Sequence, residues 1–278
     1  MLTASRSLSL NAEAGKELPR VPAMRGLYER GVRFRHGQVI MIAGRSGSQK
    51  SALAMYLAAQ MNEPSLYFSG DMSAFDASSR LASMYTGDVA DAVSAAMLRG
   101  GADRQHYLDA LKACKIQFSF GSPITWRAVD EELEAYVELH NRFPTSIFFD
   151  NLMDFEGAES DYTEQMAVMQ NATELARNTG STVWLMHHAS DKSWEAKTDP
   201  WNPPSRQEIK GGLSEKPELS LTVALDPNDL SFRVACVKQR SGPCDPSARS
   251  YAILWAEPEL CRFHAESPMN RAMQEARQ

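Results

Sequence analysis

The chain has 278 residues, 43% of them hydrophobic and 23% charged, and its net charge is −6. This composition excludes a disordered or collagen-like chain, because apolar residues are plentiful and there are only 16 glycines and 14 prolines. No apolar run approaches the roughly 20 residues of a membrane-spanning helix, and the first residues do not resemble a secretion signal. The four cysteines form no zinc or disulfide motif. We therefore expect a cytoplasmic protein.

The first part of the chain is basic. Residues 1–36 carry seven basic and three acidic side chains, a net charge of +4, which leaves −10 on the remaining 242 residues. Such a segment suits nucleic acid or the acidic surface of a neighbouring subunit, and composition favours neither. Because residues 1–20 lack hydrophobic periodicity, we predict an arm or linker there, one main domain over 21–260 and a tail over 261–278.

From residue 37 onward, short apolar runs alternate with amphipathic segments. The runs typical of strands lie at 38–44, 65–71, 115–121, 145–150, 181–188, 219–225, 231–240 and 250–259, and helical patterns lie at 51–61, 74–87, 88–112, 126–142 and 162–180. This alternation predicts an α/β fold with a mainly parallel central sheet flanked by helices.

The clearest motif is a phosphate-binding loop between the first strand and its helix. It follows the pattern G-x-x-x-x-G-K-[ST] with one departure, glutamine at the second glycine position, and it comprises Gly44, Arg45, Ser46, Gly47, Ser48, Gln49, Lys50 and Ser51. Backbone N–H groups of such a loop surround phosphates at a helix N-terminus, the lysine contacts the β- and γ-phosphates, and the serine binds Mg²⁺. The glutamine side chain can crowd the phosphate or resist the loop's backbone torsions. The alternative is a serine- and glycine-rich turn with a chance lysine.

Two carboxylates follow later strands. Asp150 ends the apolar run at 147–149, and the carboxyl end of a parallel strand faces the nucleotide in folds of this class, where a carboxylate holds Mg²⁺. Asp71 ends the strand that follows the loop helix and is a candidate to activate the attacking water. Its alternative role is a cap for the helix that begins near Ser73.

Two further strand ends carry candidate residues. Because side chains alternate along a strand, only one of His187 and His188 can face the site, and with no third ligand nearby we predict no metal site there. Lys238 and Arg240 lie on one face of a late strand and could together contact an anion. The alternative for this pair is a solvated strand end.

Six segments, in this order, resemble the RecA-like ATPase core of the DnaB-type replicative helicases, over about residues 21–256. They are MRGLYERGVRFRHGQVIMIAGRSGSQKS, YFSGDMSAFDASSRLAS, TSIFFDNLMDF, VWLMHHAS, IKGGLSEKPELSLTV and VKQRSGP. The family's N-terminal helical domain has no counterpart here, so the chain looks like a compact phage- or plasmid-type member. The resemblance implies a RecA-like P-loop fold and a ring, with six subunits expected, that hydrolyses ATP to move along single-stranded DNA.

The resemblance also implies a role for each candidate. Lys50 and the loop hold ATP, Ser51 and Asp150 hold Mg²⁺, Asp71 replaces the family's catalytic glutamate, and His188 senses the γ-phosphate. Lys238 and Arg240 reach the neighbouring subunit's nucleotide as a basic finger. The expected DNA contacts are Lys192, Arg206, Lys210, Gly211 and Gly212, and a primase or a helicase loader is a further implied partner.

Two alternative functions stay open on the sequence. A recombination or repair ATPase, or a helicase loader, shares the fold and would form a filament or act on another ring. A nucleotide-gated assembly protein that barely hydrolyses ATP is the other, with Gln49 at the glycine position as its signature.

Overall fold

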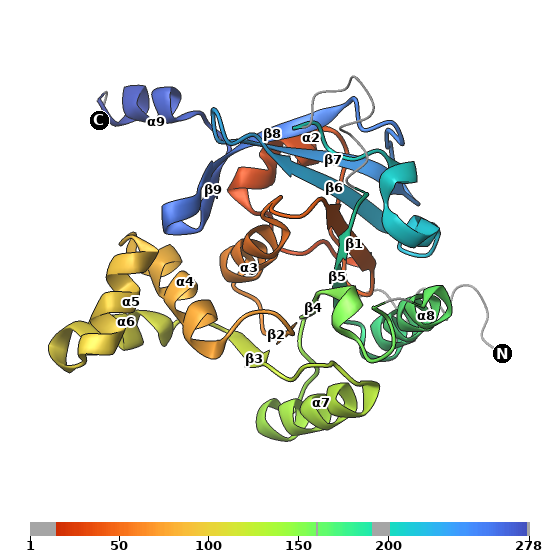
Figure 1. The fold of residues 1–278 in the computed structure, drawn as a ribbon, viewed down its shortest axis with the longest axis horizontal. Coiled ribbons are helices and arrows are strands. Elements are labelled where there is room, and N and C mark those ends of the chain that lie inside the picture. The colour runs from red at the N-terminus through yellow and green to blue at the C-terminus, as the bar shows by residue number, and fades with distance from the viewer. Residues whose placement is uncertain (1–14, 160, 191–200, 277–278) are drawn as a thin grey trace.

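The computed structural model describes residues 15–159, 161–190 and 201–276, and a nine-stranded sheet runs through this part of the chain (Figure 1). The strand order is β3-β2-β4-β5-β1-β6-β7-β8-β9. The strands are β1 (Val39–Gly44), β2 (Ser65–Ser69), β3 (Ile116–Ser119), β4 (Ser146–Asp150), β5 (Thr182–His188), β6 (Leu219–Leu225), β7 (Ser231–Gln239), β8 (Tyr251–Glu257) and β9 (Arg262–His264).

The first six strands along the chain are parallel, and the last three add an antiparallel edge. The central strand β1 lies between β5 and β6, and its last residue, Gly44, is level with His188 and Val223. All six residues of β1 are buried, because helices cover both faces of the sheet. The predicted α/β fold with a mainly parallel sheet is confirmed. The carboxyl ends of β1, β2, β4, β5 and β6 lie on the same side of the sheet, where the strands end.

Helices connect the parallel strands and flank the sheet (Figure 1). The α-helices are α2 (Arg25–Glu29), α3 (Lys50–Met61), α4 (Ala74–Thr86), α5 (Ala90–Arg99), α6 (Gly101–Leu111), α7 (Trp126–His140), α8 (Tyr162–Thr179) and α9 (Pro268–Glu275). Short 3-10 helices are η2 (Pro22–Met24), η3 (Leu152–Asp154), η5 (Arg206–Glu208), η6 (Lys210–Glu215) and η7 (Pro258–Leu260). No helix of the described residues is long and apolar enough to cross a membrane.

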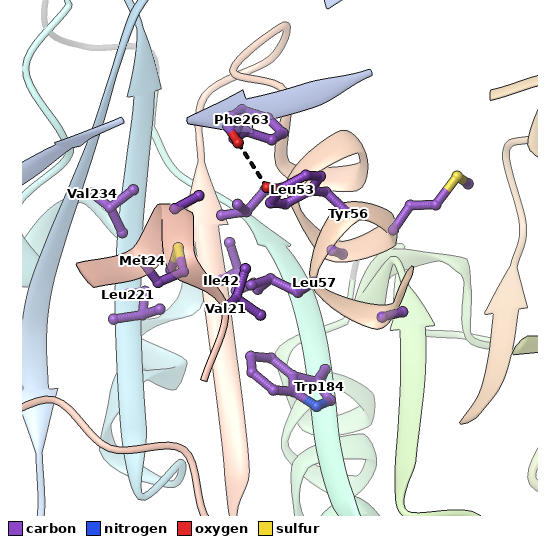
Figure 2. Close-up of a cluster of buried hydrophobic side chains, with 14 of the residues drawn as sticks. Val21, Met24, Ile42, Leu53, Tyr56, Leu57, Trp184, Leu221, Val234 and Phe263 are labelled. Carbon is purple, nitrogen blue, oxygen red and sulfur yellow. Dashed lines mark hydrogen bonds between the residues drawn. The ribbon is translucent and has the colours of Figure 1, made fainter. Parts of the chain in front are cut away.

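One face of the sheet packs against α3 and against the segment that precedes β1. Figure 2 shows this core, where Leu53 and Leu57 of α3 lie near Ile42 of β1 and Trp184 of β5. The hydroxyl of Tyr56 donates a 2.7 Å hydrogen bond to the carbonyl of Phe263, which ties α3 to β9 (Figure 2). The helix that carries the phosphate loop is therefore held rigidly on the sheet.

The opposite face packs against α7, α8 and η6. Val129 and Leu133 of α7, Met169 of α8 and Leu213 of η6 are buried in one apolar cluster with Met41 and other residues of the sheet. Side chains alternate along each strand, so the same strands contribute to both cores. Successive side chains of β5 consequently point toward α3 on one face or toward α8 and η6 on the other. The two adjacent histidines of β5 therefore lie on different faces of the sheet.

Helices α4, α5 and α6 form a group at one side of the molecule (Figure 1). They share a small apolar cluster built from Ala82, Val93, Ala96 and Tyr107. The single helical stretch expected over 88–112 is two helices, because Gly100 adopts φ 78° and ψ −160°, a conformation open essentially to glycine alone. The end of α4 at Gly87 is as predicted.

Residues on either side of the predicted main domain also pack against it. Within the predicted arm, Leu18 is buried, and Glu17 forms a bridge with Arg35. Within the predicted tail, β9 pairs with β8, and Phe263 is buried against Tyr56 and Phe232. Apolar side chains at 18 and 263 complete the core over α3, a long-range packing requirement that local periodicity does not reveal.

Candidate functional site

The phosphate loop leaves the carboxyl end of β1 and enters α3 at Lys50. A Cβ on Gly44 would collide with the Ser48 hydroxyl and lie 3.0 Å from Val223, so the turn requires glycine there. The Ser48 hydroxyl is buried and has no hydrogen-bond partner among the described residues. Lys50 is buried, and its ammonium donates to the Arg45 carbonyl at 3.2 Å. A buried hydroxyl donor and a buried ammonium on one helix N-terminus are the groups that a phosphate would satisfy.

Gln49 adopts the left-handed conformation, with φ 62° and ψ 29°, directly before α3. A residue with a Cβ pays roughly 1–2 kcal/mol for this conformation, which is the reason that the motif favours glycine here. Gln49→Gly should therefore raise the free energy of unfolding by up to about 1 kcal/mol. Denaturant titration measures this difference. Gln49→Ala is the control, because it removes most of the side chain but keeps the strained torsion. Equal stability of the glycine and alanine variants would show that the torsion carries no cost.

Ser51 and Asp150 meet at the edge of the sheet, although 99 residues separate them. The Ser51 hydroxyl donates to Oδ1 of Asp150 at 2.9 Å, and the buried Tyr67 hydroxyl donates to Oδ2 at 2.8 Å. Burial raises the pKa of Asp150, against the lowering effect of these two hydrogen bonds and of Lys50. A hydroxyl and a carboxylate side by side at the end of the loop are oxygen ligands of the kind that Mg²⁺ takes, so these residues fit the ion.

Asp71 lies just beyond β2 and faces the residues that follow Asp150. The amide of Asn151 donates to Oδ2 of Asp71 at 3.3 Å. Asp71 does not cap α4, because the hydroxyl of Ser73 occupies the N-cap and accepts from the N–H of Asp76 at 3.1 Å. The capping alternative is therefore wrong, and Asp71 is exposed at the site edge.

Asp154 is a carboxylate that the sequence did not single out. It accepts from the backbone N–H of Asn151 at 2.7 Å and packs against Gly70. Burial raises the pKa of Asp154 to about 6, the hydrogen bond from Asn151 opposes this shift, and the charges of Asp71 and Asp150 add to it. No motif marks this residue, since its proximity to Asp71 depends on how two loops meet.

The two histidines of β5 point to opposite faces of the sheet. His187 is fully buried, and its Nε2–H donates to the carbonyl of Lys210 at 3.0 Å. Burial lowers the pKa of His187 to about 4, so this ring stays neutral. His188 is level with Gly44 of the phosphate loop and lies on the face that carries α3. The packing of α3 on this face places His188 on the side of the candidate nucleotide site.

The candidate DNA-contacting residues lie in the segment that follows β5. Lys192 lies outside the described residues. Arg206 begins η5, and its Nε donates to the Ser214 hydroxyl at 3.1 Å. Lys210, Gly211 and Gly212 are exposed at the start of η6, and both glycines have positive φ.

This segment is joined directly to the end of β5 and to the phosphate loop. Ala189 forms a bridge with Ile209, and the N–H of Ser190 donates to the Glu208 carbonyl at 2.7 Å. The guanidinium of Arg45 pairs with the Glu208 carboxylate at 2.8 Å. Burial tends to raise the pKa of Glu208, but hydrogen bonds from Ser205 and the charge of Arg45 outweigh it, and the net shift is downward. A cavity of about 990 Å³ opens beside this ion pair, and Arg45, Arg206, Gly212 and Arg249 line part of it.

Arg240 lies at the opposite end of the strands from the phosphate loop, and Lys238 is level with Met41 in the middle of β1. The Lys238 ammonium donates to the Glu215 carbonyl, and Arg240 pairs with Glu218 at 3.4 Å while its side chain is 59% exposed. Burial and the nearby charges of Arg206 and Arg240 lower the pKa of Lys238. The structure thus separates these two cations from the phosphate loop of the same chain.

Comparison with known proteins identifies a family and two phage relatives. Residues 3–193 match the model of a family described as an AAA domain. The chain is 29% identical over 263 residues to the Gene 65 protein of Mycobacterium phage L5, covering 91% of this chain and 95% of that protein. It is 28% identical over 227 residues to the Gene 65 protein of Mycobacterium phage D29, covering 78% of this chain and 94% of that protein.

Two solved structures share the fold at 15% sequence identity. One is a DnaB-like replicative helicase described with its interactions with primase, with a TM-score of 0.76 over 94% of this chain and 67% of that chain. The other is described as an ATPase domain, with a TM-score of 0.74 over 95% of this chain and 96% of that chain. The chain therefore belongs to the AAA domain family of nucleotide-binding ATPases and has the RecA-like fold of DnaB-type helicase ATPase domains.

Proposed function

We propose that this protein is a ring-forming DNA helicase that couples ATP hydrolysis to movement along single-stranded DNA in replication. The observation that carries this proposal is the direct backbone pairing of residues 189–190 with residues 208–209. It joins the end of the strand beside the phosphate loop to the segment that carries Arg206 and Lys210. A change at the nucleotide site therefore has a short physical route to the candidate DNA contacts.

On this proposal each residue of the nucleotide site has a separate task. Lys50 and the N–H groups of the loop bind the β- and γ-phosphates, and Ser51 and Asp150 would hold Mg²⁺. Bound Mg²⁺ neutralises charge that develops on the phosphate oxygens. Asp71 orients the attacking water and accepts its proton, and His188 responds to the presence of the γ-phosphate.

The position of Lys238 and Arg240 supports a site shared between subunits. The Arg240 N–H donates to the Glu218 carbonyl, and the Glu218 N–H donates to the Val39 carbonyl, so Arg240 is level with the first residue of β1. Gly44 lies five residues further along β1, about 16 Å away at the usual rise per residue. Arg240 cannot reach the phosphate loop of its own subunit over that distance. Lys238 is level with Met41, and its ammonium is bound to the Glu215 carbonyl. A head-to-tail neighbour would bring them to the next nucleotide, which is the arrangement of a ring.

The charge distribution suits a ring that grips DNA in its channel. The whole chain carries −6, whereas the candidate contacts place cations and two glycine backbones on one exposed segment. An exposed basic segment of this kind can bind the phosphate backbone without reading the bases. Primase, which the DnaB-like relative is described with, is the additional partner that we propose.

A second candidate function is a nucleotide-gated assembly protein with weak hydrolysis. The observation that favours it is Gln49, which holds a strained left-handed torsion at the position where the motif has glycine. A recombination or repair ATPase, or a helicase loader, would use the same core as a filament or beside another ring. The three functions differ in turnover and in the shape of the assembly.

The deciding experiment measures ATP hydrolysis with and without single-stranded DNA, beside displacement of one strand from a forked duplex. A helicase should show hydrolysis that rises when single-stranded DNA is added, strand displacement that requires ATP, and closed rings by electron microscopy. Hydrolysis that stays negligible with DNA present would favour the assembly protein. Filaments without strand displacement would favour the recombination ATPase.

Lys210→Ala should weaken binding to single-stranded DNA and flatten its salt dependence. Each lost phosphate contact releases one fewer counterion, which changes the slope of log affinity against log salt by about 0.7. Fluorescence anisotropy with oligonucleotides of two different sequences measures the slope, and both should change equally. Lys112→Ala is the control, since this exposed lysine lies at the end of α6 and pairs with Asp109. A parental slope for Lys210→Ala would place the DNA contacts elsewhere, with the basic segment 1–36 tested next.

A further inference from the structure

A short hydrogen-bonded chain runs from Asp154 to Asp71 through one residue. The Asp154 carboxylate accepts from the backbone N–H of Asn151 at 2.7 Å, and the side-chain amide of Asn151 donates to Asp71 at 3.3 Å. The carbonyl oxygen of the same amide accepts from the N–H of Met153 at 2.7 Å, which fixes the orientation of the amide group. The NH₂ group of Asn151 is thereby directed toward Asp71.

Asp154 also contacts the backbone directly before Asp71. A Cβ built on Gly70 would lie 2.6 Å from Oδ2 of Asp154, so this carboxylate lies against the Gly70 backbone at a distance that only glycine allows. The N–H of Gly70 in turn donates to the carbonyl of Asp150 at 3.0 Å. The turn that carries Asp71 is therefore bound on one side by Asp150 and packed on the other by Asp154.

Asp71 needs such support because it is exposed and lies beyond the end of β2. An unsupported aspartate at a strand end samples several rotamers, and a displacement of about 1 Å at a reacting group can lower turnover roughly 100-fold. The supports of Asp71 come from η3 and its N-cap, which are buried or half-buried. A water-orienting carboxylate that is shorter than glutamate has fewer torsions of its own, so the backbone that carries it must be placed accurately.

We propose that Asn151 and Asp154 are positioning residues that hold Asp71 in the orientation required to activate water. Asn151 acts through its amide, and Asp154 acts by fixing both the Asn151 backbone and the Gly70 turn. This inference rests on the role proposed above for Asp71. Because both residues act on the turn that carries Asp71, their effect should fall on turnover and not on nucleotide affinity.

The test compares steady-state kinetics of Asn151→Ala, Asp154→Ala and Asp154→Asn in the full chain. The two alanine variants should lower kcat roughly 10- to 100-fold, while KM and the calorimetric Kd for Mg-ATP stay within about 2-fold. Asp154→Asn should recover most of the lost turnover, because its amide oxygen still accepts from the Asn151 N–H. Asp161→Ala is the matched control, since Asp161 also accepts from a backbone N–H, that of Thr163 at 2.7 Å, at the start of α8.

Two further measurements separate positioning from general stability. Amide hydrogen exchange at residues 70–71 should be faster in Asp154→Ala than in Asp161→Ala. In single-turnover assays, adding Asn151→Ala to Asp71→Asn should slow hydrolysis no further, because the residue on which Asn151 acts has already lost its function.

The outcomes distinguish this inference from the function on which it rests. If Asp71→Asn abolishes turnover but Asn151→Ala and Asp154→Ala both keep the parental kcat, the positioning role is wrong and the role of Asp71 stands. If Asp71→Asn itself turns over ATP at the parental rate, the proposed function of Asp71 is wrong and the positioning role is lost with it. Should Asp154→Ala fail to fold, the kcat of Asn151→Ala decides alone, because its backbone hydrogen bonds remain.

Discussion

Asp71→Asn should lower ATP turnover by a factor of about 10² to 10⁴ and leave the Kd for Mg-ATP nearly unchanged. A carboxylate that orients water and accepts its proton contributes mainly in the transition state, so its loss affects kcat far more than ground-state binding. The asparagine keeps the size of the side chain and an oxygen that can accept the hydrogen bond from Asn151. Single-turnover hydrolysis measures the loss, and calorimetry measures the affinity.

Asp76→Asn is the control for this experiment. Asp76 is an exposed carboxylate in the first turn of α4, close to Asp71 in the chain, and it accepts a hydrogen bond from Ser73 instead of facing the site. Its substitution should leave turnover unchanged. Parental turnover of Asp71→Asn would mean that another carboxylate acts on water. Glu208 is then the next candidate, although its pairing with Arg45 occupies it in this structure.

Arg240→Ala should bind Mg-ATP with parental affinity and lose nearly all hydrolysis, by about 10³-fold or more, if it acts as a finger on the neighbouring subunit. The guanidinium stabilises charge that develops during phosphoryl transfer, and within its own subunit it pairs with Glu218, away from the phosphate loop. Turnover per subunit of the parent should also rise with protein concentration, because a shared site exists only in the assembly. Arg99→Ala is the control, since Arg99 is 62% exposed and also forms one surface ion pair, with Asp103.

A mixing experiment tests the shared site directly. Lys50→Ala should lose Mg-ATP binding, because Lys50 is the buried ammonium of the phosphate loop. Mixed with Arg240→Ala, it should restore part of the activity, because some interfaces then combine an intact loop with an intact finger. If Arg240→Ala alone keeps full turnover, Arg240 is a solvated strand end paired with Glu218. If co-assembled mixtures stay inactive, either the finger acts within its own subunit or the ring needs every site intact.

Local sequence patterns were sufficient for the fold class, the ends of α4 and α8 and the position of the phosphate loop. A buried parallel strand has a continuous apolar run in the sequence. A glycine in the left-handed conformation marks the end of a helix, as Gly87 does for α4 and Gly180 for α8. The same holds for Asp150, since a carboxylate that ends an apolar strand lies at the carboxyl edge of the sheet wherever the strand is placed. Because side chains alternate along a strand, the sequence also predicted that the two histidines of β5 point to opposite faces of the sheet.

What the alternation could not decide is which histidine faces the loop, and only the packing of α3 on one face and η6 on the other places His188 and His187. The pairings of Ser51 with Asp150, Arg45 with Glu208 and Asn151 with Asp71 join residues 80 to 163 positions apart. Such contacts form where several loops meet at the carboxyl ends of the strands, and no short-range sequence period predicts them.

The distance of Arg240 from its own phosphate loop likewise depends on strand register. Strand β7 runs antiparallel to β6 and returns the chain to the opposite end of the strands.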